Sequence, residues 1–267
     1  MTADSNAKSQ GLPSWVTELF NQFLNHHDDL ARVLHLSING ISMLRGRYTA
    51  LKVLTEVDGP TETSAAQLAR AEKERELAQS ELDDDFPLLH EQATVALWAS
   101  LEALVRSFVA GWLANRPDAW QADAVKRLKV RLGDYEALET ADRCLWVTDL
   151  LDQDIGGPLR AGITRFESLL APFSLNGTVE PETQKTLFEL SQIRHNIIHR
   201  RGLADRRLLE ACPWLGLVAG ARVRVSHKMW RGFNDATAAY ALELIQRSRE
   251  AHGLGRYVHQ EPPPTPP

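Results

Sequence analysis

Residues 182–202 read ETQKTLFELSQIRHNIIHRRG. The apolar residues of this run recur every three or four positions, the period at which side chains share one face of an α-helix. Pro181 suits the first turn of a helix, because the N–H that a proline lacks has no partner there in any case. Gly202 is typical of a helix end, where left-handed backbone is common. The sequence therefore predicts a helix over residues 182–201 whose polar residues gather at its C-terminal end.

The same period continues through most of the chain and predicts an all-α fold, a helical bundle. From Gly220 to His227, valines alternate with polar residues, which predicts one short strand or extended piece and no more. A break is expected inside the second helix, at Asn39-Gly40. The expected helices cover residues 14–24, 30–57, 64–82, 86–114, 120–132, 135–151, 159–170, 182–201 and 233–249.

Composition divides the chain into three parts. Residues 1–82 are predicted to form a helical N-terminal region, with an exposed helix or helical arm at 64–82 that is rich in good helix formers. Residues 83–253 hold the most apolar periodic run and are predicted to form a second helical domain. Residues 254–267 are rich in proline, which disfavours both helix and sheet, and are expected to be a disordered tail.

The overall composition indicates a globular protein of the cytoplasm. The chain has 267 residues, 43% of them apolar, which is enough for a sizeable core. Cys144 and Cys212 lack C-x-x-C spacing, so neither a disulfide framework nor a zinc module is expected. No signal-peptide pattern is present at the N-terminus. Residues 93–114 reach the length of a membrane span, but Glu102 and Arg106 interrupt them, which favours a core helix.

Charge is unevenly distributed in this weakly acidic chain, whose net charge is -5. Residues 60–100 carry nine acids against three bases, a balance of -6. Residues 180–231 carry ten bases against five acids, a balance of +5. Such a basic segment is compatible with binding a polyanion, and equally with a solvated basic face.

The C-terminal end of the predicted helix at 182–201 gathers groups that serve in phosphate chemistry. His195 and His199 lie roughly 40° apart on a helix and so share a face, whereas Arg194 and His199 lie roughly 140° apart. One helix therefore does not easily aim Arg194 and His199 at a single phosphate. A two-fold axis would bring Arg194 of one copy near His199 of the other, because an isologous interface joins equivalent surfaces. This geometry favours a composite site in a homodimer.

The spacing of Arg194 and His199, followed by Arg201, Gly202 and Asp205, resembles the R-x4-6-H signature of the HEPN family of helical nucleic-acid-associated proteins. Residues 98–104 (WASLEAL) also resemble the first core helix of many members, in which an acidic residue faces the motif helix. Members often have asparagine after the arginine, where this chain has a histidine followed by asparagine. The resemblance covers about Phe86 to Arg249 and implies a HEPN-type bundle; residues before 83 lie outside it.

Family members with an intact motif resemble metal-independent endoribonucleases, often of toxin-antitoxin or anti-phage systems. That resemblance implies RNA as the substrate, a homodimer, an antitoxin or sensor protein as a further partner, and no cofactor or metal. Cleavage would leave a 2′,3′-cyclic phosphate and a 5′-hydroxyl. The expected site comprises a general base (His199), a transition-state stabiliser (Arg194), orienting or leaving-group-side donors (His195, Asn196), a positioning carboxylate (Glu102) and phosphate-binding side chains (Arg200, Arg201).

Three other interpretations of the same residues stay open. His195 and His199, four residues apart, could bind zinc, although the sequence offers no obvious third ligand and has Asn196 where a metalloprotease has glutamate. The chain could instead be a non-catalytic RNA- or partner-binding module of the same fold. Finally, both histidines could be structural residues of an all-helical protein.

Overall fold

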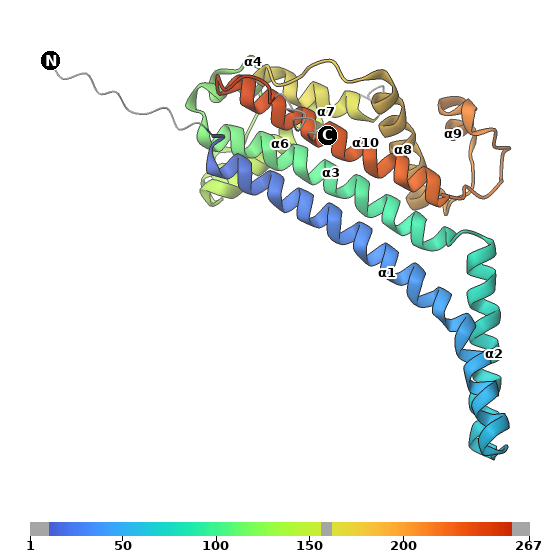
Figure 1. Cartoon of the computed structure of the whole chain (residues 1–267). Helices are drawn as coiled ribbons and strands as arrows, with labels where there is room; N and C mark the ends of the chain where they lie inside the picture. Colours follow the sequence, from blue (N-terminus) through green and yellow to red (C-terminus); the bar gives the residue numbers. More distant parts are fainter. Residues whose placement is uncertain (1–10, 156–161, 258–267) are drawn as a thin grey trace, which may run out of the picture. The chain divides into compact units, whose positions relative to one another are not determined.

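A computed structural model describes residues 11–155 and 162–257 of the chain. Its described residues are mostly helical and include no strand, which confirms the all-α prediction. Three short 3-10 turns, Pro117–Gln121, Ala171–Phe173 and Pro213–Leu215, join some of the helices. The α-helices are α1 Ser14–Asp58, α2 Glu62–Asp83, α3 Pro87–Asn115, α4 Asp123–Lys126, α5 Leu132–Glu136, α6 Thr140–Ile155, α7 Ile163–Leu170, α8 Pro181–Arg200, α9 Arg206–Ala211 and α10 His227–Ala251 (Figure 1).

The fold comprises two compact units, each assembled from separate stretches of the chain. Unit 1 draws on Met1–Leu24, Leu101–Phe188 and Ala236–Pro267, and unit 2 on Asn25–Ser100 and Glu189–Asp235. That residues 83–253 fold as a domain without the N-terminal region stays a prediction. Of the tail expected at 254–267, residues 258–267 lie outside the described residues, as does the predicted start of the helix at 159–170.

Unit 1 is organised around aromatic residues of α3. The ring of Phe108, which is fully buried, lies 5.7 Å from the ring of Phe20 and 6.0 Å from that of Trp15 on α1. Close to these rings, Gly111 brings the α3 backbone so near to Trp15 that an added Cβ would lie 2.6 Å from the indole carbon Cζ3. The close approach of α1 and α3 in unit 1 therefore requires glycine at position 111.

Substitution of Gly111 by alanine tests this packing. Alanine normally stabilises a helix relative to glycine by up to about 1 kcal/mol. At Gly111 the steric conflict with Trp15 should outweigh that gain and lower the free energy of unfolding by about 1–3 kcal/mol. Gly232 on α10 is the matched control, because no atom lies within 4 Å of its added Cβ. Chemical denaturation should show Gly111→Ala destabilised and Gly232→Ala unchanged or stabilised; two equally stable variants would contradict the packing argument.

A buried polar cluster lies elsewhere in unit 1. Arg247, only 6% exposed, donates hydrogen bonds to both carboxylate oxygens of Glu167 at 2.8 and 2.9 Å. The phenol of Tyr240 donates to the same carboxylate at 2.7 Å. Burial, together with that carboxylate, raises the pKa of Tyr240 well above its usual range. The cluster satisfies its own charges, so we assign it a structural role in holding α7 against α10.

In unit 2, the C-terminal part of α1 and the whole of α2 form an antiparallel pair (Figure 1). Two neighbouring contacts join the two helices at one level of the pair. Arg47 forms an ion pair with Glu74 at 2.5 Å, and the guanidinium of Arg75 lies 5.2 Å from the centre of the Tyr48 ring. Helix α2 begins at a capping box, in which Thr61 and Ser64 satisfy each other's backbone N–H groups. The helical arm that the sequence predicts is thus a helical hairpin.

Acids near the turn between α2 and α3 hold the extended segment 220–226. Arg222 donates to the Glu91 carboxylate at 3.0 Å, and Arg224 forms an ion pair with Asp84 at 2.6 Å. The Glu91 side chain is 4% exposed and the Arg222 side chain is 51% exposed, so the carboxylate is shielded from water and the guanidinium is not. The acidic and basic stretches of the sequence therefore meet, in part, within unit 2.

A histidine pair completes this junction. His90 is fully buried, and its Nδ1 donates to the carbonyl oxygen of Asp85 at 2.8 Å. Its Nε2 accepts a hydrogen bond from Nδ1 of His227, 3.2 Å away, at the start of α10. The Asp85 carboxylate accepts the backbone N–H of His227 at 2.7 Å and so satisfies one N–H of the first helical turn. Burial lowers the pKa of His90 below its ordinary value of 6.5.

Stability should fall on acidification because of His90. A histidine whose pKa is lower in the folded state binds its proton more readily in the unfolded state, so its contribution is complete above about pH 6.5 and is lost below it. The variant His90→Gln should be less stable near neutral pH and should lose less stability between about pH 7.5 and about pH 5. Chemical denaturation at the two pH values measures the difference. An equal loss in His90→Gln and in the wild type, with exposed His26→Gln as control, would contradict this role.

Several helix predictions were wrong: those at 14–24 and 30–57 are parts of one helix, and that at 135–151 is divided between α5 and α6. Helix α1 runs through Asn39 and Gly40 without a break, and the Asn39 amide is satisfied by a hydrogen bond to the ring of His35 one turn earlier, at 2.9 Å. The helix predicted over 120–132 is reduced to the one turn of α4, since only Val125 of that helix is buried and no apolar stripe stabilises its continuation.

Other predictions agree with the structure more closely. Helices α2, α3 and α8 lie where the sequence predicts them, within two residues at each end. The segment 220–226 is extended and forms one isolated bridge, between Leu203 and Arg222. Helix α9 was not predicted, and α10 begins six residues before the predicted position 233.

Helix α3 is the described helix that is long and apolar enough to cross a membrane, by length and composition alone. The mean hydropathy of its most apolar window is 1.4, and 56% of that window is buried inside the protein. Burial to this extent is typical of a core helix, as the sequence predicts, and a single helix of this kind is weak evidence for a membrane span.

Candidate active site

The candidate site begins at the C-terminal end of α8, where the chain reverses direction. Arg201 and Gly202 both have positive φ, 55° and 72°, which ends the helix. The N–H of Gly202 donates back to the carbonyl oxygen of Asn196 at 3.3 Å. Gly202 is thus a helix stop, as its type and position predict, and it turns the chain away immediately after His199 and Arg200.

Asn196 anchors the loop that follows. Its side chain is 1% exposed, and its amide nitrogen donates to the carbonyl oxygen of Leu203 at 2.8 Å. Beyond that point the N–H of Ala204 donates to the carbonyl oxygen of Ala221 at 2.8 Å, and Val223 donates to Gly202 at 2.7 Å. The loop after α8 is therefore tied both to the helix and to the extended segment, which fixes the direction in which α8 ends.

His195 and His199 lie together on α8, as their spacing predicts. Their ring centroids are 4.6 Å apart. His199 is exposed and His195 is half-buried, so the two rings reach from the body of unit 2 to its surface. Arg194 precedes them and is also half-buried. Being roughly 140° from His199 around the helix, Arg194 occupies a different face of α8.

Burial lowers the pKa of His195, and the positive charge of Arg207 and the neighbouring imidazole of His199 lower it further. His195 is therefore favoured in its neutral form near neutral pH, with one ring nitrogen able to accept a hydrogen bond and the other able to donate one. The hydrogen bond from the N–H of Leu208 lowers the pKa of the Asp205 carboxyl. Asp205 is the N-cap of α9 and remains ionised beside this group of cations.

The basic residues around the site divide into paired and exposed ones. Arg200, for which phosphate binding was predicted, forms an ion pair with Asp205 at 3.0 Å. Arg201 and Arg207 are exposed, and within the described residues neither has a carboxylate at ion-pair distance. Sequence reasoning counted Arg207 only as part of the basic segment. Arg207 lies two residues after Asp205, the N-cap of α9, and this position could have predicted that it lies beside the motif.

Glu102, the predicted positioning carboxylate, belongs to unit 1, whereas the motif belongs to unit 2. Within unit 1, the Glu102 carboxylate lies 3.8 Å from the guanidinium of Arg165, which also donates to Asp152 at 2.8 Å. These residues line a hollow together with Arg106, Phe166 and Leu169. The role of Glu102 toward Arg194 or His199 stays a prediction.

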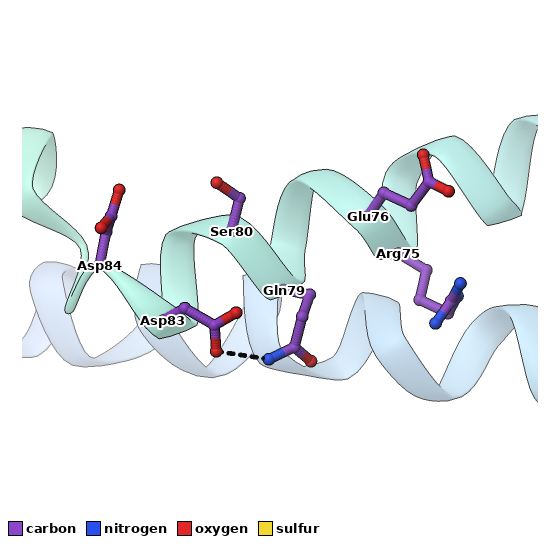
Figure 2. Close-up of a pocket in the computed structure, with 6 residues that line it drawn as sticks. All are labelled: Arg75, Glu76, Gln79, Ser80, Asp83 and Asp84. Atoms are coloured by element: carbon purple, nitrogen blue, oxygen red, sulfur yellow. Dashed lines mark hydrogen bonds between the residues drawn. The ribbon is translucent and has the colours of Figure 1, made fainter.

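A second hollow lies on the surface of α2, and Figure 2 shows the polar side chains around it. Most of these side chains already have partners: Gln79 donates to Asp83 at 2.7 Å, Asp84 is paired with Arg224, and Arg75 lies over Tyr48. Ser80 supplies a hydroxyl, but no histidine lines the hollow to accept its proton, so this hollow is a poor candidate for catalysis. Within the described residues, no group of three histidine, cysteine or acidic side chains is placed to hold a metal ion.

Comparisons of the chain with protein-family models, with curated proteins and with solved structures find no match. The geometry at the end of α8 is therefore the basis for any assignment of function.

Loss of the Asn196 amide should loosen the end of α8. Asn196→Ala removes a buried hydrogen bond and leaves the Leu203 carbonyl oxygen without that donor, which should cost about 1–3 kcal/mol. Asn115 is a matched control, because it makes a 2.8 Å hydrogen bond to the Gly111 carbonyl oxygen at an exposed position. Limited trypsin digestion after Arg200 and Arg201 should be faster in Asn196→Ala and unchanged in Asn115→Ala. Equal rates of digestion would show that the amide does not anchor the loop.

Proposed function

We propose that the protein is a HEPN-type endoribonuclease that cleaves RNA without a metal ion, through a composite site in a homodimer. The observation that carries the proposal is the pair of imidazoles at 4.6 Å on the surface end of α8, with Arg194 one residue before them. Exposed Arg201 and Arg207 add positive charge beside the pair. A cluster of positive charge of this kind attracts a polyanion such as RNA to the general base at the protein surface.

The residue types match the chemistry of RNA cleavage. His199, which is exposed, would accept the proton of the ribose 2′-hydroxyl as general base. The 2′-oxygen then attacks the adjacent phosphorus, and the bond from phosphorus to the 5′-oxygen breaks. The departing 5′-oxygen takes up a proton from water, which leaves a 2′,3′-cyclic phosphate and a 5′-hydroxyl. Arg194 would stabilise the additional negative charge on the phosphoryl oxygens in the transition state.

The supporting residues have different roles in this proposal. The pKa of His195 is lowered by burial, so we assign it to orientation of the phosphate through a neutral ring N–H. Asn196, buried and bonded to Leu203, positions the end of α8. Arg201 would hold a flanking phosphate, and Arg200 would do so when it is released from Asp205. Glu102 is retained as a positioning carboxylate.

A second copy would complete the site, because Arg194 and His199 project from different faces of one helix. Packing about a two-fold axis would bring Arg194 of one subunit to His199 of the other. Exposed apolar residues at this end of unit 2 support such an interface: Ile198 is 44% exposed and Leu203 is 48% exposed. We place this activity in the cytoplasm, in a toxin-antitoxin or anti-phage setting, with an antitoxin or sensor protein as a further partner.

Cleavage of a structured RNA in excess EDTA tests the proposal. Wild-type protein should cut it to cyclic phosphate and 5′-hydroxyl ends, and Arg194→Ala and His199→Ala should each be at least ~100-fold slower. Arg45→Ala and His26→Ala, at exposed positions of α1 distant in sequence from the motif, are the matched controls and should cleave normally. A substrate with deoxyribose at the cut site should resist cleavage, because it lacks the nucleophile.

Two outcomes would reject this function. Efficient cleavage of the deoxy-substituted substrate would remove the 2′-hydroxyl mechanism. If wild-type protein binds RNA but leaves it intact, the non-catalytic RNA-binding module becomes the better description. In both cases, circular dichroism of each variant should establish that the helices remain folded.

A further inference from the structure

The part of α1 that belongs to the helical hairpin carries a second, mainly apolar stripe, which touches α2 through the ion pair of Arg47 with Glu74. Positions 33, 36, 40, 43, 47, 50, 54 and 57 are spaced alternately three and four residues apart, which is the a/d pattern of a coiled coil. The pattern extends over about three and a half heptads, which is long enough to specify a coiled coil. The stripe comprises Val33, Leu36, Gly40, Met43, Arg47, Ala50, Leu54 and Val57.

Every residue of this stripe is exposed. Met43 and Val57 are each 77% exposed, Leu36 is 61% exposed, Val33 is 58% exposed and Leu54 is 56% exposed. Scattered exposed apolar residues are ordinary, but a row of them along one helix face, interrupted here at Gly40 and Arg47, indicates a binding surface. The position of the pattern before Val33 is the charged Asp29, and the helix ends just after Val57, at Asp58, before Gly59.

The stripe is distinct from the face that packs within unit 2. The inward face of α1 includes Leu34, Ile41, Tyr48 and Thr55, all of them buried or half-buried. At 100° per residue, the centres of the two faces lie roughly 130° apart around the helix. Helix α1 therefore has one face occupied in its own chain and a second face that is available to another helix.

We propose that this stripe pairs with the same stripe of a second copy, as an antiparallel coiled coil centred near residue 45. In an antiparallel pair, each a position lies opposite a d position of the other helix. Here the two position numbers of every layer sum to 90. Val33 then meets the partner's Val57, and Leu36 meets the partner's Leu54. This pairing matches the two helices to each other along the stripe, which covers about 36 Å of helix.

The inner layers support the same register. Gly40 lies opposite the partner's Ala50, so the backbones can approach closely there. Met43 lies opposite the partner's Arg47, and the flexible thioether can pack on the apolar stem of arginine. The guanidinium of Arg47 is already neutralised by Glu74 of its own chain at 2.5 Å. Each of the four kinds of layer thus pairs side chains that fit together, without an unpaired charge.

Parallel pairing of two copies is less favourable. It would place Arg47 opposite the partner's Arg47, so that two Arg47–Glu74 ion pairs are buried in one layer of the apolar seam, which is costly. It would also leave Gly40 opposite the partner's Gly40, which packs little apolar surface. The register therefore favours the antiparallel second copy as the occupant of the stripe. This inference does not depend on ribonuclease activity or on the interface proposed for α8.

Cysteine cross-linking tests both the partner and the register. The two native cysteines are 4% and 1% exposed and give a low background. A mixture of full-length Leu36→Cys and Leu54→Cys should form disulfide-linked dimers under mild oxidation, because the two positions share a layer. Each variant alone should form few, since its two copies of the new cysteine lie about 27 Å apart in the antiparallel pair. Leu77→Cys mixed with Leu36→Cys is the control: Leu77 is 62% exposed but lies on α2, outside the stripe.

The mass of the particle in solution gives an independent result. Leu36→Asp/Leu54→Asp should weaken association through the stripe ~100-fold or more, because two carboxylates would be buried in the seam. Leu77→Asp should leave association unchanged. The proposal is overturned if Leu36→Cys or Leu54→Cys cross-links as well alone as in the mixture, which indicates parallel pairing. It is equally overturned if the mixture forms no selective disulfide, which indicates that another molecule occupies the stripe.

Discussion

The pairing of acids at the α2–α3 turn with the basic segment 220–227 is the interaction on which unit 2 depends. Asp84 forms an ion pair with Arg224, and Glu91 accepts a hydrogen bond from Arg222. Asp85 accepts the first backbone N–H of α10. Each carboxylate is close enough for a charge-assisted hydrogen bond, which is stronger than a neutral one. The extended segment in turn pairs by backbone hydrogen bonds with the loop that follows α8. The direction in which the candidate site faces is therefore set by contacts remote from it in sequence.

Because of these contacts, only part of the basic excess between residues 180 and 231 is available to bind a polyanion. Arg222 and Arg224 serve the fold, and Arg200 and Arg206 have acidic neighbours at 3.0 and 2.6 Å. Net charge along the sequence therefore overstates the positive charge available to a polyanion. The exposed cations that remain most suitable, Arg201 and Arg207, lie on either side of the N-cap Asp205. A binding surface of this size suits one or two phosphates close to the imidazoles, and it gives no basis for a long basic groove.

Much of the fold could be predicted from local pattern, and the failures have physical causes. Helices α3 and α8 combine a long apolar period with clear end signals, so single residues do not alter the outcome. Gly40 misled the prediction because the cost of one glycine, about 1 kcal/mol, is small beside the packing of a 45-residue helix. Helix α9 has only six residues, fewer than two turns, and its start depends on the cap at Asp205. Elements that short have no periodic signal.

Some features of the candidate site follow from local sequence spacing, and others depend on contacts between residues that are farther apart in the chain. That His195 and His199 share a face follows from a spacing of four residues, and the structure agrees with it. The tie from Asn196 to Leu203 spans a turn whose backbone includes two residues with positive φ, and no periodicity encodes that path. The lowered pKa of His195 has a similar origin, because it depends on burial and on Arg207, which reaches the ring only after the chain has reversed. The sequence therefore indicates which groups the candidate site holds, and the reversal of the chain after α8 accounts for part of the lowered pKa of His195.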